Sequence, residues 1–343
     1  MSTKCTARGV RSALVLGTAA LVVVFVAWAV VAAAPKWEPF STQDDEFDPR
    51  VHASYTALPP PPSHDAWALS KQAYDYALGH PGTVVMSENE PRLLLLKSFV
   101  SPEERDHLVA RNRPRLEPSK VLSGEADKVR TSMGAWVEKS DPVAQRVQDR
   151  IHRTVGIPLS YGEDIYVLNY QQRQEYKKHN DHCMDTGDVA SEPCLKLLRQ
   201  GGGPSCGRGA GGPTCGDRLA TFIIYLKTPE LGGRTVFPEA AATKAALGTL
   251  PIDKAAKDGI EWYCANPKVL GVAPKAGDAV LFWNYTPGDG GSGGDNGAGT
   301  FADGSAKPAA RRVFAAMHSG CPVIKGEKWI TTRWIRSAPF DAN

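Results

Sequence analysis

Residues 166–181 read YVLNYQQRQEYKKHND, and this stretch decides both the predicted fold and the predicted chemistry. Its first five residues are aromatic or aliphatic apart from one asparagine, a composition typical of a strand. A polar turn follows, and we expect residues 176–181 to continue as a second strand. Side chains two positions apart on a strand point to the same face, so His179 and Asp181 can bind one metal ion together.

A second histidine and a lysine extend this metal hypothesis. His318 follows residues 312–317, which we predict to be a strand, and Lys328 comes shortly after it. Two imidazoles and one carboxylate hold Fe(II) and leave the other coordination positions open. Lys328 offers a cation for the distal carboxylate of 2-oxoglutarate, whose 2-oxo acid group would chelate the iron while O2 takes the last position.

Five blocks of the sequence resemble, in the same order, those of prolyl 4-hydroxylase catalytic domains of the plant and green-algal type. The blocks are residues 170–181, 218–226, 232–238, 274–283 and 318–334. The resemblance runs from about Leu93 to the C-terminus and covers most of the chain. Upstream, residues 129–136 resemble the mobile loop that covers the substrate in this family. The chain departs from the family at Arg173, where a glycine is usual.

The resemblance implies an enzyme that hydroxylates peptidyl proline at C4 in proline-rich secretory or cell-wall proteins. Such an enzyme consumes O2 and 2-oxoglutarate and releases succinate and CO2, with ascorbate as a reductant. In this chain the resemblance implies that His179, Asp181 and His318 bind Fe(II), and that Lys328 pairs with the C5 carboxylate of 2-oxoglutarate.

Further residues match the cosubstrate and peptide sites of the family. Tyr170 and Thr235 match residues that help to hold 2-oxoglutarate. A proline-rich peptide lacks most N–H donors and arrives as a preformed polyproline II helix, so a groove with aromatic walls and arginine or tyrosine donors suits it. The positions that match this groove are Arg130, Ser132, Trp136, Glu163, Tyr176, Arg218 and Trp334.

Two other functions fit parts of the sequence. A barrel could bind proline-rich chains without catalysis, although such a module has no need of the three metal ligands and the lysine together. A type II membrane glycosyltransferase would share the topology described below, but we find no D-x-D motif. The net charge of +3 over 343 residues, with acidic and basic residues well mixed, does not indicate nucleic acid binding. The sequence leaves the oligomeric state open.

An uncharged apolar stretch over residues 12–35 is long enough to cross a bilayer as a helix. Lys4, Arg8 and Arg11 precede it, so the positive-inside rule places residues 1–11 in the cytosol and the rest of the chain in the lumen. We therefore expect a signal anchor in the endoplasmic reticulum or Golgi membrane. A signal peptide cleaved near the alanines at 32–34 is the alternative.

The cysteines agree with this topology. Cys5 would face the cytosol, whereas six cysteines would face an oxidising lumen in which disulfides form. Six cysteines allow fifteen pairings, and the family resemblance favours the pair Cys264–Cys321. A zinc site is disfavoured because no Cys-x2-Cys spacing occurs. The remaining four cysteines would fasten the loop after the first metal ligands: Cys183, Cys194, Cys206 and Cys215.

We expect residues 36–90 to form a proline-containing lumenal stem and residues 91–343 to form the catalytic domain. Ser101-Pro102 and Asp141-Pro142 are typical helix starts. Few helices interrupt the later strands, which predicts a mainly β fold with flanking helices, closed as an antiparallel double-stranded β-helix, or jelly roll. The remaining predicted strands are residues 219–226, 268–273, 279–283 and 329–336.

Three further features lie outside the predicted strands or at their ends. Residues 201–213 and 288–299 are rich in glycine, so we expect them to be mobile loops. They could line the peptide groove or have no function. Asn284-Tyr-Thr286 is an N-glycosylation sequon at the end of a predicted strand.

Overall fold

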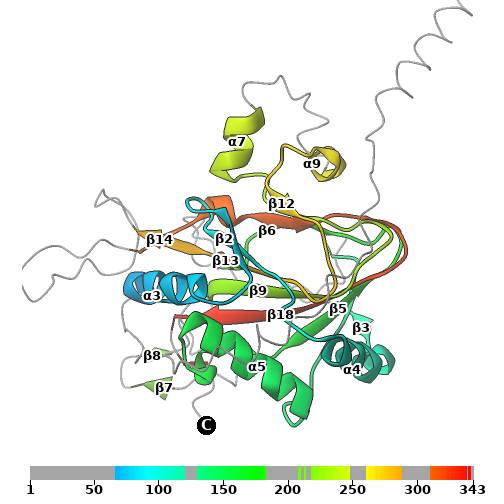
Figure 1. Cartoon of the computed structure of the whole chain (residues 1–343), viewed down its shortest axis with the longest axis horizontal. Helices are drawn as coiled ribbons and strands as arrows, with labels where there is room; N and C mark the ends of the chain where they lie inside the picture. The colour runs from blue at the N-terminus through cyan, green and yellow to red at the C-terminus, as the bar shows by residue number, and fades with distance from the viewer. Residues whose placement is uncertain are drawn as a thin grey trace, which may run out of the picture. The chain divides into compact units, whose positions relative to one another are not determined.

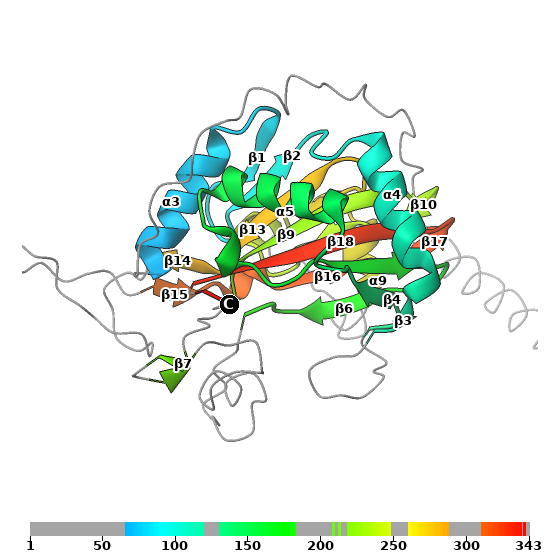
Figure 2. The same cartoon turned by 90° about the horizontal axis from the view of Figure 1, so that it is seen from below.

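The computed structural model describes residues 66–119, 130–182, 208–209, 212–213, 218–247, 260–287, 310–337 and 339–340. A large antiparallel sheet carries three helices on one face and a smaller sheet on the other (Figures 1 and 2). The predicted mainly β fold with flanking helices is thereby confirmed.

The larger sheet contains eight strands in the order β1-β2-β13-β9-β18-β5-β4-β3, and every neighbouring pair is antiparallel. The long strands β9 and β18 lie at its centre and pair over most of their length. In sheet order the strands are Thr83–Ser87, Leu93–Leu96, Ala279–Trp283, Arg218–Lys227, Lys328–Arg336, Tyr166–Tyr170, Met133–Trp136 and Glu117–Pro118.

The smaller sheet has the order β12-β11-β16-β6, again antiparallel. Its strands are Gly271–Val272, Thr235–Val236, His318–Gly320 and Tyr176–His179. Three two-stranded pairs complete the described strands. They are β10 (Leu231–Gly232) with β17 (Val323–Lys325), β14 (Tyr285–Pro287) with β15 (Ala310–Arg312), and β7 (Arg208–Gly209) with β8 (Gly212–Pro213).

The larger sheet separates two hydrophobic cores because its side chains alternate between its faces. On β9, Phe222 and Ile224 face the helices, whereas Ile223 and Tyr225 face the smaller sheet. All four are buried. The face toward the smaller sheet therefore supplies the walls of the space between the two sheets.

Helices α3 (Ala66–Leu78), α4 (Pro102–Asn112) and α5 (Pro142–Val155) cover the other face. Both predicted helix starts are confirmed. The Ser101 side chain accepts a hydrogen bond from the Glu104 N–H and the Glu104 carboxylate accepts one from the Ser101 N–H, which is a capping box. The Asp141 carboxylate caps α5 by accepting hydrogen bonds from the N–H groups of Val143 and Ala144. The remaining helices are α7 (Ala241–Leu247) and α9 (Ile260–Ala265), with 3₁₀ turns at Arg113–Arg115, Leu159–Tyr161 and Phe314–Ala316.

The structure corrects the predicted start of the folded domain. Leu69, Ala73 and Ala77 of α3 are fully buried in the core, and β1 pairs with β2. Both elements lie in the predicted stem over residues 36–90, so the domain begins by Ala66. Within the described residues, no helix is both long and apolar enough to cross a bilayer, and residues 12–35 lie outside that part.

Three local predictions were also wrong. The predicted strand over residues 312–317 is replaced by the 3₁₀ turn Phe314–Ala316, because this apolar run has no alternation to favour a strand. Strand β6 ends at His179, so Asp181 lies beyond it. The first glycine-rich segment, expected to be a loop, contains the paired strands β7 and β8, whereas the second lies outside the described residues.

Arg173, where the resemblance leads us to expect glycine, has a left-handed backbone with a φ of 68°. It lies in the turn between β5 and β6, and its N–H donates to the Val323 carbonyl at 2.7 Å. This conformation brings the Cβ of an L-residue close to the neighbouring carbonyl, whereas glycine adopts it freely.

We expect Arg173→Gly to raise the free energy of unfolding by roughly 0.5–1 kcal/mol, because relief of the strain outweighs the added entropy of the unfolded chain. Arg173→Ala retains the Cβ atom and should give no such gain. Urea unfolding of both variants measures the difference. Equal stabilisation by alanine would show that the arginine side chain, and not the backbone conformation, is responsible.

Candidate active site

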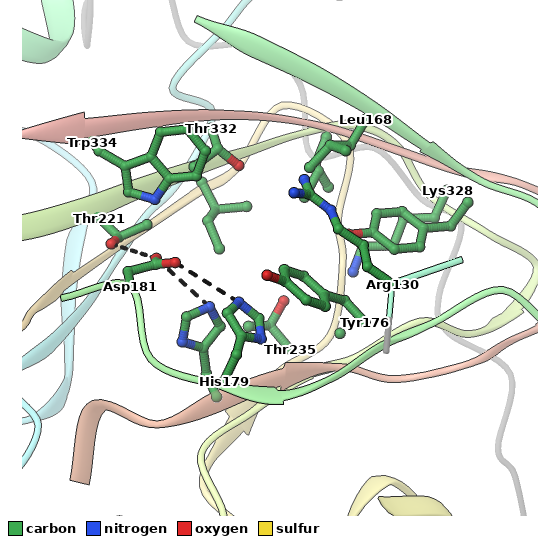
Figure 3. Close-up of a pocket in the computed structure, with 15 residues that line it drawn as sticks. Arg130, Leu168, Tyr176, His179, Asp181, Thr221, Thr235, Lys328, Thr332 and Trp334 are labelled. Atoms are coloured by element: carbon green, nitrogen blue, oxygen red, sulfur yellow. Dashed lines mark hydrogen bonds and ion pairs between the residues drawn. The ribbon is translucent and has the colours of Figure 1, made fainter. Parts of the chain in front are cut away.

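Three potential metal ligands converge between the two sheets. Strands β6 and β16 pair so that His179 and His318 are direct cross-strand partners, and Asp181 follows just after β6. The Nε2 atoms of His179 and His318 lie 3.8 Å from Asp181 Oδ1 and Oδ2 respectively. One ligand atom from each residue lies within 4.8 Å of the other two, close enough to share an ion (Figure 3).

Each imidazole is oriented through its second ring nitrogen. His179 Nδ1 lies 2.7 Å from the Lys177 carbonyl, and His318 Nδ1 lies 3.1 Å from the Ala316 carbonyl. A proton on Nδ1 satisfies each carbonyl and leaves the Nε2 lone pair for a metal. Burial lowers the pKa of both rings, that of His179 to about 3, so both are neutral at physiological pH. This set of two neutral imidazoles and a carboxylate fits Fe(II).

The carboxylate of Asp181 is also held in its charged form. Burial by itself would raise its pKa, but His318, His179 and Arg218 together with a hydrogen bond hold that pKa far below its usual range. The hydrogen bond comes from the Thr221 hydroxyl, which donates to Asp181 Oδ2 at 2.7 Å.

The Thr221 hydroxyl in turn accepts a hydrogen bond from Asn284 Nδ2 at 3.3 Å. Asn284 is fully buried, so glycosylation at its sequon, which the sequence leaves open, is incompatible with this packing. The asparagine supports the metal ligands from inside the fold instead.

Lys328 lies at the other end of the pocket from the three ligands (Figure 3). Its side chain is fully enclosed, and Nζ donates to the Gly233 carbonyl at 2.8 Å. The ring centres of Tyr170 and Tyr225 lie 5.4 and 5.7 Å from Nζ. Burial lowers the pKa of Lys328 to about 7, and no carboxylate among the described residues contributes to that value. A bound anion would supply the missing countercharge.

The two residues predicted to hold the cosubstrate lie beside this lysine. Tyr170 is the cross-strand partner of Lys328, and Thr235 Oγ1 accepts a hydrogen bond from the Tyr225 hydroxyl at 2.9 Å. Tyr170 and Thr235 both line the pocket. The end opposite the metal ligands therefore combines one cation with hydroxyl groups, which is suited to a carboxylate.

Three of the predicted groove residues also line the pocket: Arg130, Tyr176 and Trp334. The Arg130 guanidinium lies 4.7 Å from the Tyr176 ring centre, and the Tyr176 ring stacks on His179. Arg218 stacks on Trp334, 3.8 Å from its ring centre. These contacts connect the metal ligands to an aromatic and cationic rim.

The last three residues predicted for the peptide groove lie around that rim and do not line the pocket. Glu163 accepts two hydrogen bonds from Arg218, at 2.6 and 2.8 Å, so it orients the guanidinium. Ser132 is buried and donates to the Ser119 hydroxyl at 3.1 Å. Trp136 is 51% exposed and lies 6.4 Å from Trp334, ring centre to ring centre.

Sequence reasoning missed several pocket residues that share one signal. Positions 328, 330, 332 and 334 all line the pocket, as expected for alternate side chains on the single strand β18. The same alternation on β5 and β9 would have identified others. The unpredicted lining residues are Leu168, Thr221, Ile223, Gly320, Ile330 and Thr332.

The disulfide favoured by the resemblance is present. Cys264 at the end of α9 is bonded to Cys321, directly after β16, with Cα atoms 5.7 Å apart. The other cysteines lie outside the described residues.

Comparisons with known proteins agree with this geometry. The family model described as the 2OG-Fe(II) oxygenase superfamily matches residues 165–336. Prolyl 4-hydroxylase 1 of Arabidopsis thaliana is 32% identical over 278 residues, which are 79% of this chain and 77% of that protein. Prolyl 4-hydroxylase 5 of the same plant is 30% identical over 261 residues, which are 73% and 70% of the two chains.

Among solved structures, the viral collagen prolyl hydroxylase vCPH from Paramecium Bursaria Chlorella virus-1 is 22% identical. The match covers 74% of this chain and 99% of the viral chain, with a TM-score of 0.40. The family model is incompatible with the glycosyltransferase alternative. The sequence matches show that the chain belongs to the 2OG-Fe(II) oxygenase superfamily and, within it, to the prolyl 4-hydroxylase family.

Proposed function

We propose that this protein hydroxylates peptidyl proline at C4, with Fe(II), O2 and 2-oxoglutarate, and releases succinate and CO2. The observation that carries the proposal is a single pocket with His179, Asp181 and His318 at one end and the buried Lys328 at the other. Membership of the prolyl 4-hydroxylase family supports the substrate class. The substrates would be proline-rich secretory or cell-wall proteins.

In this function the three ligands would hold Fe(II), and the bound iron would supply the oxidising chemistry with O2. Lys328, with Tyr170 and Thr235 beside it, would bind the C5 carboxylate of 2-oxoglutarate. Because Lys328, Tyr170 and Thr235 are buried, this end of the pocket would shield the bound carboxylate from water. Ascorbate would serve as the reductant.

The rim of the pocket would bind the peptide. A polyproline II helix exposes its carbonyls, and the guanidinium groups of Arg130 and Arg218 can donate to them. Tyr176 and Trp334 offer flat apolar surfaces for proline rings. Glu163 would act indirectly by orienting Arg218.

We also propose a single-pass type II protein of the endoplasmic reticulum or Golgi membrane with a lumenal catalytic domain. The uncharged stretch over residues 12–35, preceded by basic residues, supports this orientation. The disulfide Cys264–Cys321 supports an oxidising compartment.

In sealed microsomes we expect the catalytic domain to resist added protease until detergent is present, and digestion without detergent would contradict this topology.

The purified protein should release CO2 from 2-oxoglutarate when Fe(II) is present, and a poly-proline peptide should stimulate this turnover. We expect His179→Ala and His318→Ala to abolish turnover, since each removes a metal ligand. His107→Ala is a matched control, because His107 binds Asp141 on the helical side of the fold. Mass spectrometry of the peptide detects the hydroxyl group. Binding of the peptide without turnover would favour the non-catalytic alternative.

The low pKa of Lys328 predicts a pH dependence of cosubstrate binding. The ammonium form binds the dicarboxylate, so above about pH 7 binding must take up one proton. The dissociation constant of 2-oxoglutarate should therefore rise by up to about tenfold per pH unit above that point and stay level below it. Calorimetry in buffers of different ionisation enthalpy measures both the dissociation constant and the number of protons taken up. Lys328→Ala should weaken binding and abolish the proton uptake, whereas an unaltered proton uptake would exclude this role.

A further inference from the structure

Arg234 lies between the two residues that shape the cosubstrate end of the pocket. The carbonyl of the residue before it, Gly233, accepts the hydrogen bond from Lys328. The residue after it, Thr235, lines the pocket and accepts the hydrogen bond from the Tyr225 hydroxyl. Arg234 itself does not line the pocket. Its effect on the site must therefore pass through its two neighbours.

The Arg234 side chain binds three backbone carbonyls, one in the last turn of α9 and two in the segment between α9 and β12. Nη1 donates to the carbonyls of Cys264 and Asn266, and Nη2 donates to that of Val269, each at 3.1 Å. These carbonyls include groups at the C-terminal end of α9, where the helix leaves acceptors without a partner. Burial lowers the pKa of Arg234, but the group stays charged at physiological pH.

The same residues form a closed ring of contacts. Arg234 donates to the Cys264 carbonyl, Cys264 is covalently bonded to Cys321, and the Cys321 N–H donates back to the Arg234 carbonyl at 2.8 Å. Cys321 directly follows β16, the strand that carries His318. The ring thus connects α9 to the start of β11, which carries Thr235, and to the end of β16, which carries His318.

The backbone next to Arg234 is held by its contacts and not by a conformational preference of its own. Gly233 has a φ of 75°, and a Cβ atom there would lie 3.2 Å from Lys328 Cδ. The glycine backbone can adopt several conformations at similar energy, so contacts must select one of them. The Gly233 N–H donates to the Pro322 carbonyl at 2.9 Å, and the three hydrogen bonds of Arg234 hold the adjoining residue.

We propose that Arg234 is a positioning residue for 2-oxoglutarate, which sets the Gly233 carbonyl and the Thr235 hydroxyl around Lys328. The inference rests on the proposed function of the pocket. Arginine suits this role because its planar group offers five N–H donors in a fixed fork. A lysine keeps the charge but cannot bind three separated carbonyls in one geometry.

The test is Arg234→Lys in the full-length protein loaded with Mn(II) in place of Fe(II), so that 2-oxoglutarate binding is measured by calorimetry without turnover. We expect the dissociation constant of 2-oxoglutarate to rise about tenfold, since small displacements of binding groups weaken such contacts strongly. In the Fe(II) enzyme the KM for 2-oxoglutarate should rise likewise, while the KM for the peptide changes less than about twofold. Arg234→Gln should have the same effect if the lysine variant is unstable.

Arg150→Lys is the matched control. Arg150 also combines a backbone carbonyl with other acceptors, donating to Phe99 and to both oxygens of Glu104, but it joins α5 to α4 away from the pocket. Arg150→Lys should lower the Tm without changing the affinity for 2-oxoglutarate. If Arg234→Lys lowers the Tm and leaves the affinity for 2-oxoglutarate unchanged, Arg234 has only a structural role. This inference then fails, whereas the proposed function stands. If the wild-type protein does not bind 2-oxoglutarate, the proposed function fails with it.

Discussion

The site depends on the antiparallel pairing of β6 with β16. This pairing sets His179 opposite His318, and the chain leaving β6 then brings Asp181 to the same point. A carbonyl two residues before each histidine holds its ring, so the local backbone fixes both the position and the protonation state of the donors. Loss of register by one residue would turn an imidazole to the opposite face of the sheet. The metal site and the smaller sheet therefore form one structural unit.

Strand β18 connects the two ends of the pocket. Lys328 lies at its start and Trp334 near its end, and alternate residues between them line the space. The intervening side chains on the other face, such as Trp329 and Ile335, are buried in the core beneath the helices. Helices without any residue in the pocket thereby hold the strand that spans it. Burial of a lysine without a countercharge costs stability, which is a reason to expect an anionic ligand there.

Local signals in the sequence were sufficient for the helix starts and most long strands. The capping box at Ser101 and strand β13, whose residues are mostly β-branched or aromatic, are examples, because each depends on neighbouring residues only. The 3₁₀ turn before His318 was missed because tertiary contacts override a short apolar run without periodicity. The same limit applies to the site. Metal ligands have a recognisable spacing, whereas a backbone carbonyl such as that of Gly233 exists at every residue and becomes informative only in three dimensions.

The short pair β14–β15 brings together the two residues that border the glycine-rich segment 288–309 in the sequence. Pro287 faces Ala310 across this pair, so the described chain stops and resumes at adjacent backbone positions. Doubling the number of residues between two fixed ends costs only about 0.6 kcal/mol in closure entropy. Insertions and deletions here would leave His318 and its strand in place. During evolution the length of this segment can therefore diverge while selection preserves the oxidative chemistry.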